Sequence, residues 1–244
     1  MTLIKICKQS LLFVWYFLRL PSYKFHKFPL KNKFNGTAHV LVNGPSLRDT
    51  LKDYDSGKIK IDDNSFFVNL SALDSHFLQI KPKHYCLSDP MFYQDYLPKK
   101  DAIRKVYDIF NNDVDWDMYL YLCFPTEKEY DKLEQYAGLT NPHVKIIRMN
   151  RKTCASLVPA WRNKLYASGY FMPEDGTIAN TAIYLALLEG YKEIRLYGGG
   201  DLLGGTAEPW CEDLQVYSWL SPCEKRAGGP GGGLGGQHQH GLPD

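Results

Sequence analysis

The stretch that decides the fold is His39-Val-Leu-Val-Asn-Gly-Pro-Ser-Leu47. A short apolar run ends in Asn-Gly-Pro-Ser, and the residues from Ser46 onward have the pattern of a helix start. In open α/β sheets, ligands bind where the carboxyl end of a strand meets the N-terminus of a helix. Gly44 lets the backbone pass close to a ligand, and Pro45 presets a helical φ at the first helical position. Since free N–H groups there favour a phosphate, the stretch predicts a phosphate-binding turn or an ordinary strand–turn–helix connection.

The length and composition are those of one sizeable globular domain with short appendages. The 244 residues are 44% hydrophobic and 23% charged, with a net charge of +2. This charge is unevenly spread, because residues 1–48 contain eight Lys and Arg and no Asp or Glu. The rest of the chain therefore sums to −6, and the asymmetry predicts that the N-terminal arm touches an anionic surface.

The six cysteines are scattered, with no Cys-x-x-Cys pair and no accompanying pair of histidines. This pattern predicts neither a zinc site nor a disulfide framework, and it fits a reducing cytosol. Cys86 and Cys123 fall in apolar stretches, so we expect them to be buried thiols.

An apolar and aromatic run at residues 11–18 lies between Lys8 and Arg19. It is shorter than the ~20 residues that a membrane-spanning helix needs, and no small-residue cleavage site follows it. Two interpretations remain: a segment that lies in an anionic membrane surface, or a helix docked on the protein's own core. The basic residues do not recur on one helical face with base-reading partners, so no nucleic acid partner is expected.

Strand-like and helix-like segments alternate along the middle of the chain. Strands are predicted at residues 38–42, 66–68, 84–87, 118–124, 144–149 and 194–197. Helices are predicted at residues 46–54, 71–79, 101–110, 126–136 and 177–189, with Thr126 and Glu129 forming a capping box. The alternation predicts an α/β, Rossmann-like domain at residues 35–203, with a mostly parallel sheet and helices on both faces. A basic, apolar helical arm at residues 1–34 precedes it.

The composition changes after Tyr197. Thirteen of the 20 glycines fall there, and after Arg195 the chain has one Lys and no Asn or Ile. The change indicates either a disordered tail at residues 204–244 or a coding break that replaced another C-terminus. His238 and His240 lie in this stretch, and neither is assigned as a catalytic base because a glycine-rich tail positions nothing.

Polar residues follow the ends of two more predicted strands and precede the last helix. Asn69 comes after the second strand, Asp89 after the third, and Thr177 before an apolar helix. In a parallel sheet, these residues and Asn43 would converge at the carboxyl edge, where Asn suits ribose or base hydrogen bonds. Thr177 also fits a helix N-cap and Asp89 a turn, so each has a structural alternative.

These residues together resemble the bacterial sialyltransferases of glycosyltransferase family 42 and the related motility accessory factor and 6-hydroxymethylpterin diphosphokinase-like family. The matching pieces, within residues 38–201, are Asn43–Leu47, Val68-Asn69, Ser88–Pro90, Gly176-Thr177 and Gly190–Ile194. The resemblance implies a domain that binds a nucleotide-activated sugar, a CMP-sugar, and transfers the sugar to a glycan acceptor without a metal. The donor-binding residues it implies are Asn43, Gly44, Pro45, Ser46, Asn69, Asp89 and Thr177.

The chain departs from the family pattern in two places. Asp89 stands where the sialyltransferases carry Asn, and a carboxylate beside a phosphate calls for a cation such as Mg²⁺. That favours an ATP- and Mg²⁺-dependent diphosphokinase-like enzyme, with Asp89 near the metal. The family's catalytic histidine and tyrosines follow the Gly-Tyr-Lys-Glu-Ile strand, where this composition changes. Catalytic residues are therefore not assigned, and a non-catalytic nucleotide-binding module is the third interpretation.

The arm and the resemblance together predict where the protein acts. We expect a bacterial transferase of polysaccharide or surface glycan synthesis, cytoplasmic and held at the inner face of the cell membrane. Residues 1–34 are the expected peripheral membrane contact.

Overall fold

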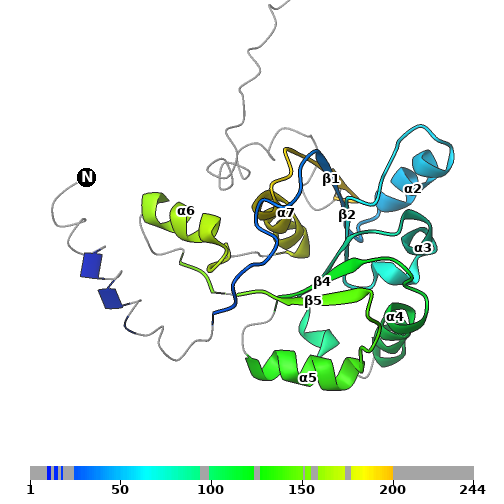
Figure 1. Cartoon of the computed structure of the whole chain (residues 1–244). Coiled ribbons are helices and arrows are strands. Elements are labelled where there is room, and N and C mark those ends of the chain that lie inside the picture. Colours follow the sequence, from blue (N-terminus) through cyan, green and yellow to red (C-terminus); the bar gives the residue numbers. More distant parts are fainter. Residues whose placement is uncertain are drawn as a thin grey trace, which may run out of the picture.

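The domain is built on one six-stranded, all-parallel sheet with the strand order β5-β4-β3-β2-β1-β6, seen in a computed structural model (Figure 1). This confirms the predicted α/β, Rossmann-like class with its parallel sheet. The structure describes residues 10–11, 14–15, 18, 25–93, 99–123, 127–150, 152–154, 159–173 and 177–199. The predicted tail at residues 204–244, the capping residue Thr126, and most of the arm before residue 25 lie outside the described residues.

All six predicted strands are present. They are β1 (Thr37–Leu41), β2 (Ser65–Val68), β3 (His84–Leu87), β4 (Met118–Leu122), β5 (Val144–Arg148) and β6 (Glu193–Tyr197). Successive residues of a strand point to opposite faces, so Phe66 joins the core on one face and Phe67 the core on the other. Because helices cover both faces, the central strands are continuous apolar runs rather than alternating ones.

Four helices lie where helices are predicted, within a few residues: α2 (Leu47–Asp55), α4 (Lys100–Asn112), α5 (Glu127–Ala137) and α7 (Ile178–Glu189). The single helix predicted at residues 71–79 is wrong. It is a 3₁₀ turn, η2 (Ser71–Leu73), followed by α3 (His76–Ile80). Asp74 between them is extended, and its carboxylate accepts a hydrogen bond from the N–H of His76, which starts the chain turning again. The sequence did not predict α6 (Pro159–Ser168) or the 3₁₀ turn η3 (Pro90–Phe92).

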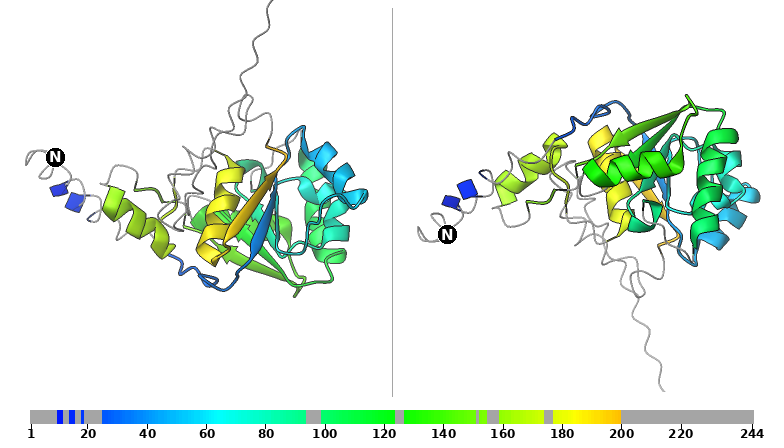
Figure 2. Two further views of the ribbon diagram at one scale, coloured as in Figure 1. Left: turned by 90° about the horizontal axis from the view of Figure 1, so that it is seen from above. Right: turned by 90° about the horizontal axis from the view of Figure 1, so that it is seen from below.

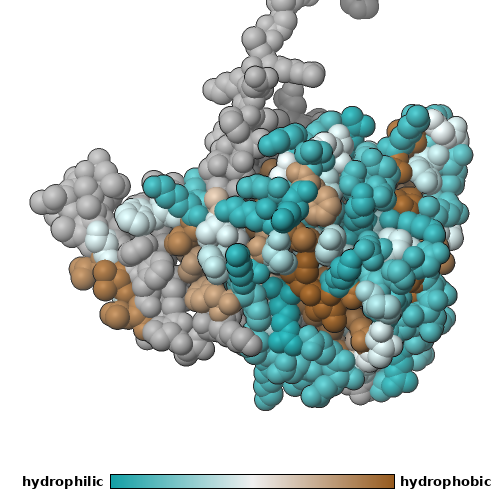
Figure 3. Space-filling model, in the orientation of Figure 1, coloured by the Kyte–Doolittle hydropathy of each residue, from teal (hydrophilic) through white to brown (hydrophobic). Residues whose placement is uncertain are grey.

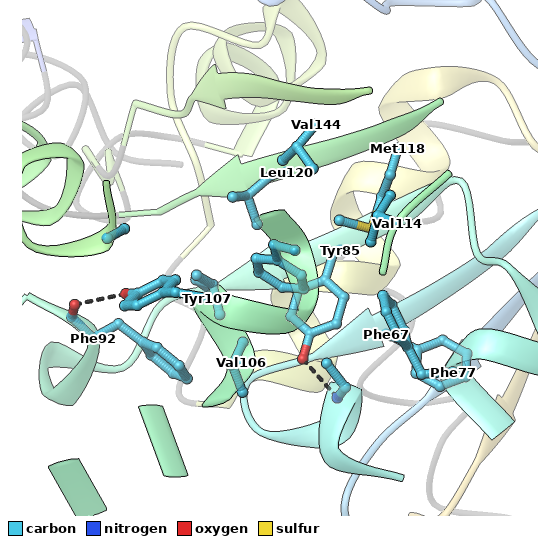
Figure 4. Close-up of a cluster of buried hydrophobic side chains, with 14 of the residues drawn as sticks. Phe67, Phe77, Tyr85, Phe92, Val106, Tyr107, Val114, Met118, Leu120 and Val144 are labelled. Carbon is cyan, nitrogen blue, oxygen red and sulfur yellow. Dashed lines mark hydrogen bonds between the residues drawn. The ribbon is translucent and has the colours of Figure 1, made fainter. Parts of the chain in front are cut away.

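One face of the sheet carries α2, α3, α4 and α5 and the other carries α7 (Figure 2). Aromatic residues fill the space under the four helices, with Phe77 of α3 edge-on to Tyr85 of β3 (Figure 4). The Tyr107 hydroxyl donates to the backbone oxygen of Phe92, so its polar end is satisfied inside the apolar layer.

Helix α7 is buried on nearly all sides, since nine of its twelve residues are buried. It packs on β1, β2 and β3, and the chain at residues 25–34 covers its far side. The N–H groups of Asn32 and Phe34 donate to the carbonyls of Leu188 and Glu189 at the end of α7. An apolar helix enclosed in this way has no polar face, which explains its uniform sequence.

The direction of winding reverses between β1 and β6. From β1 to β5 each strand lies beside the previous one, with the connecting helices on one face. The connection from β5 to β6 returns across the sheet through α7 on the opposite face. In such sheets, ligands bind outside the carboxyl ends of the strands at the reversal point, which here is between β1 and β6.

Candidate functional site

Three predicted site residues leave the sheet at the same edge, on three neighbouring strands. Val40 of β1 lies beside Phe66 of β2, which lies beside His84 of β3. Asn43 and Asn69 each come three residues after these aligned positions, and Asp89 follows the end of β3 by two residues. The parallel register therefore brings the three polar residues to one carboxyl edge.

A hollow of about 530 Å³ opens beside this edge. The loop after β1, one face of α2 and the turn before α3 form its walls. Its lining residues are Asn43, Gly44, Pro45, Leu47, Arg48, Leu51, Lys52, Asp55, Asp74 and His76. Of the predicted site residues, Asn43, Gly44 and Pro45 thus line it, whereas Ser46, Asn69, Asp89 and Thr177 do not.

Gly44 makes a close approach to the chain's own backbone. A Cβ atom at Gly44 would lie 1.7 Å from the carbonyl oxygen of Gly198, in the loop after β6. Gly198 has a φ of +80°, and a Cβ there would lie 2.0 Å from the Val42 oxygen. The two loops at the reversal point therefore touch through glycines, and Gly44 is required by this contact whatever it binds.

Pro45 does not occupy the first position of a helix, so that expectation is wrong. The N–H of Leu47 donates to the Gly44 carbonyl at 3.0 Å, which closes a turn with Pro45 as its second residue. The fixed φ of proline suits that turn position as well as a helix start. Ser46 is the N-cap residue of α2, and its carbonyl accepts from the N–H of Thr50.

Asn69 combines a rare backbone conformation with an unsatisfied side chain. Its φ is +49°, in the left-handed region that asparagine tolerates better than most residues. The Tyr85 hydroxyl holds this conformation, since it donates to the Asn69 carbonyl at 2.5 Å and accepts from the N–H of Ala72 at 2.9 Å. The buried Oδ1 of Asn69 has no hydrogen-bond partner among the described residues, a state that usually costs about 1–3 kcal/mol. A fixed backbone that carries an unsatisfied polar atom is typical of a ligand site.

Asp89 and Thr177 both have the structural roles that the sequence left open for them. The Asp89 carboxylate accepts from the N–H of Met91 at 3.0 Å and caps η3. The Thr177 hydroxyl accepts from the N–H of Asn180 and caps α7. Thr177 is exposed and Asp89 half-buried, so both caps stand at the surface of the carboxyl edge.

The sequence did not point to His76, which lies in the wall of the hollow. Its Nδ1 lies 2.6 Å from Asp74 and its Nε2 lies 3.0 Å from Asp55. Burial lowers the pKa of His76, but the hydrogen bonds to the two carboxylates raise it by more. Both ring nitrogens therefore donate, and His76 ties the end of α2 to the turn before α3 rather than serving as a base.

Two cations on α2 also face the hollow. Arg48 and Lys52 are one turn apart, and Lys52 pairs with Asp49 at 2.9 Å. Arg48 and Lys52 are spaced by one helical turn, as are Leu47 and Leu51. The helix predicted at residues 46–54 therefore already placed these four residues on neighbouring rows of one helix surface. No sequence pattern predicted that Asp74 and His76 would line the same hollow, because only the packing of α3 beside α2 brings them to it.

A second polar cluster lies around the amino end of β3, and its residues His84, Tyr121, Glu189 and Tyr191 are buried. His84 of β3 lies 3.0 Å from the Tyr121 hydroxyl and 2.9 Å from the Tyr191 hydroxyl. The Tyr121 hydroxyl is also hydrogen-bonded to Glu189, and the Tyr191 hydroxyl donates to Asn64. Burial raises the pKa of Glu189 well above its usual value and lowers the pKa of His84 well below its own. Both directions favour a neutral network over an ion pair, and Glu189 Oε2 has no hydrogen-bond partner in it.

Comparisons with known proteins do not identify a family for this chain. Comparison with models of protein families, with curated proteins and with solved structures found no match. Within the part of the chain that the structure describes, no group of three or more His, Cys, Asp or Glu residues is placed to hold a metal ion. Cys86 and Cys123 are buried, as expected from their apolar surroundings.

Proposed function

We propose that this chain binds a nucleotide-activated sugar at the carboxyl edge of its sheet, as a glycosyltransferase similar to the family 42 sialyltransferases. The observation that carries the proposal is the meeting of Asn43 and Asn69 at one edge, next to the reversal point and a hollow of about 530 Å³. Asp89 and the start of α7, at Thr177, belong to the same edge.

The charges and hydrogen-bonding groups at this edge suggest where each part of the nucleotide-sugar binds. Arg48 and Lys52 line the hollow beside the turn at Asn43, so the phosphate fits there. The Oδ1 of Asn69 is buried outside the lining of the hollow, and it is the acceptor at this edge that would pair with a hydroxyl of a ribose or an amino group of a base. The sugar then lies toward the open end of the hollow, where a glycan acceptor can reach it.

The N-terminal arm supports a place at the inner face of the bacterial cell membrane. Among the described residues, no helix is long and apolar enough to cross a bilayer. Leu11, Val14 and Leu18 nevertheless lie on one helical face and are exposed, in a segment without acidic residues. An apolar, aromatic segment flanked by Lys8 and Arg19 suits the headgroup boundary of an anionic membrane surface. A membrane-bound acceptor would then lie close to the donor site.

A thermal shift experiment on the full chain tests the nucleotide. We expect CMP without metal to stabilise the protein by about 2.7 kcal/mol at 100 times its Kd. Stabilisation by ATP only when Mg²⁺ is present would instead support the diphosphokinase-like alternative, in which Asp89 faces the metal. The absence of a shift with either nucleotide would contradict both.

The substitution Asn43→Leu tests the site. It should weaken CMP binding by about tenfold or more while the free energy of unfolding stays within ~0.5 kcal/mol, because Asn43 is exposed. Asn112→Leu, an exposed change at the end of α4, is the matched control and should leave the affinity for CMP unaltered. If Asn43→Leu binds CMP as tightly as the control, the turn after β1 has only a structural role.

A further inference from the structure

A second part of the chain shares the arm's lack of acidic residues. Residues 135–173 contain six Lys and Arg and no Asp or Glu, although the chain as a whole has nearly equal numbers of both. This segment includes β5, α6 and the turn at Tyr170. Two of its cations pair with carboxylates elsewhere in the fold: Lys145 with Asp117, just before β4, and Arg148 with Glu134 of α5.

The two acid-free segments meet in the folded protein. Phe25 belongs to the arm and is the residue from which the chain is described continuously. It packs edge-on against Tyr170, with ring centroids 6.2 Å apart, and it also contacts Phe171. The N–H of His26 donates to Oδ1 of Asn150, and the Asn150 amide donates back to the His26 carbonyl. These contacts fix the root of the arm to the segment that carries α6.

The topology places both segments at the carboxyl edge of the sheet. Helix α6 lies between the carboxyl end of β5 and the start of α7, which is at that same edge. The chain from His26 to Phe34 then runs to the opposite edge, where it pairs with the end of α7 and enters β1. In both Figure 1 and Figure 2, the arm and α6 project from the same side of the molecule.

Large apolar side chains are exposed on this projection. Trp15 and Leu18 of the arm are 52% and 72% exposed, and Trp161 of α6 is 55% exposed. Lys164 is exposed three residues after Trp161, so the two share one face of α6. Figure 3 shows hydrophobic residues at the end of the molecule that carries the arm. Tryptophan beside a cation is the combination found at the headgroup level of membranes.

We infer that α6 is a second membrane-binding element, which acts with the arm to hold the carboxyl edge of the sheet against a bilayer that contains anionic lipid. This inference rests on the proposed function, because it gives the arm's membrane contact a partner and an orientation. The two segments that converge on this side contribute Lys and Arg but no Asp or Glu, and a bilayer of anionic lipid is an extended surface that attracts such basic residues. The candidate donor site then faces a membrane-bound acceptor.

The test is co-sedimentation of the full chain with vesicles of phosphatidylcholine alone or with 30% phosphatidylglycerol. We expect binding only to the anionic vesicles. Replacing one lysine near such a surface costs about fivefold in binding, so Trp161→Ala with Lys164→Gln should cost about tenfold or more. The conservative pair Trp161→Phe with Lys164→Arg should restore binding to within about twofold of the unmodified chain.

A matched control removes the same kinds of side chain from the other side of the molecule. Leu78→Ala with Lys105→Gln changes exposed residues of α3 and α4 and should bind the anionic vesicles like the unmodified chain. The inference is overturned if the α6 double variant also binds normally. It is overturned as well if the unmodified chain self-associates through α6 without binding vesicles.

An arm variant separates this inference from the proposed function. If Leu11→Ser with Leu18→Ser abolishes vesicle binding while the α6 variant does not, the arm alone holds the membrane and the inference about α6 fails. CMP binding, measured by thermal shift on each variant in the absence of vesicles, should stay unchanged. A failure of CMP to bind the unmodified chain overturns the proposed function whatever the vesicles show.

Discussion

The two edges of the sheet use polar residues in opposite ways. At the amino edge, His84, Tyr121, Glu189 and Tyr191 are hydrogen-bonded to one another inside the core, and Glu189 Oε2 is the one oxygen of these four side chains left without a partner among the described residues. At the carboxyl edge, Asn43 is exposed and Asn69 keeps an oxygen without a partner. Buried polar groups normally pair with each other, so the amino edge is organised for stability. At the carboxyl edge, the exposed side chain of Asn43 lines the hollow, where a ligand can contact it.

The largest effect is expected from a break in the amino-edge network. His84→Ala removes a fully buried ring, and each of the hydroxyls of Tyr121 and Tyr191 loses its hydrogen bond to that ring. The free energy of unfolding should fall by about 3–5 kcal/mol, measured by urea denaturation. His143→Ala, at an exposed histidine, is the control and should change it by less than ~0.5 kcal/mol. Equal effects would show that the network contributes nothing.

A smaller loss is expected at the carboxyl edge, where the two loops touch. Gly44→Ala places a methyl group against the Gly198 carbonyl, and we expect a cost of about 2–3 kcal/mol in the free energy of unfolding. Gly57→Ala is the comparison, since Gly57 has a positive φ but nothing within 4 Å of its added Cβ. It should cost only about 1 kcal/mol. A Gly44 variant as stable as the Gly57 variant would mean that the loops separate freely.

Glu189→Gln should change how stability depends on pH. Because burial raises the pKa of Glu189 in the folded protein, the folded state keeps its proton where the unfolded state loses it, above about pH 4.5. Stability then falls by about 1.4 kcal/mol for each pH unit until the folded pKa is reached, and Gln abolishes this fall. His84, with a lowered pKa, acts in the opposite direction, since stability falls as the pH drops below 6.5. In urea titrations, Glu189→Gln should still lose stability as the pH falls below 6.5. If its free energy of unfolding also continues to fall as the pH rises above 6.5, the network is not neutral.

The smallest effect on stability, with a distinct effect on binding, is expected at Asn69. Glycine adopts a φ of +49° without strain, and its entropic cost of about 1 kcal/mol offsets the gain from removing the unsatisfied Oδ1, so Asn69→Gly should leave the free energy of unfolding within ~0.5 kcal/mol. Loss of the Oδ1 hydrogen bond should weaken CMP binding about tenfold, by calorimetry. Asn32→Gly changes another asparagine with positive φ, at the opposite edge, and should leave the affinity unchanged. Equal affinity of both variants for CMP would show that Asn69 does not touch the nucleotide.

Much of the fold followed from the sequence, because apolar runs of three to seven residues that alternate with helix-like segments are typical of strands covered on both faces of a parallel sheet. Local chemistry also placed Asn43, Asn69 and Asp89 after successive strands. The helix predicted at residues 71–79 is interrupted because the Asp74 carboxylate accepts a hydrogen bond from the N–H of His76, two residues later. A search for helical periodicity does not detect such a side-chain bond, which competes with the helical hydrogen bonds. Helix α6 was missed because its apolar residues do not follow a clear helical period.

The sequence by itself determined the class of the fold, the edge at which polar residues gather, and the basic charge of the arm, since each depends on residues close together in the chain. Tertiary structure alone decided that Gly44 meets Gly198, that Tyr85 fixes Asn69, and that His76 closes the wall of the hollow. It also decided that the arm meets the segment carrying α6. These contacts join residues distant in the chain, and only the packing of the sheet and its helices brings them within reach.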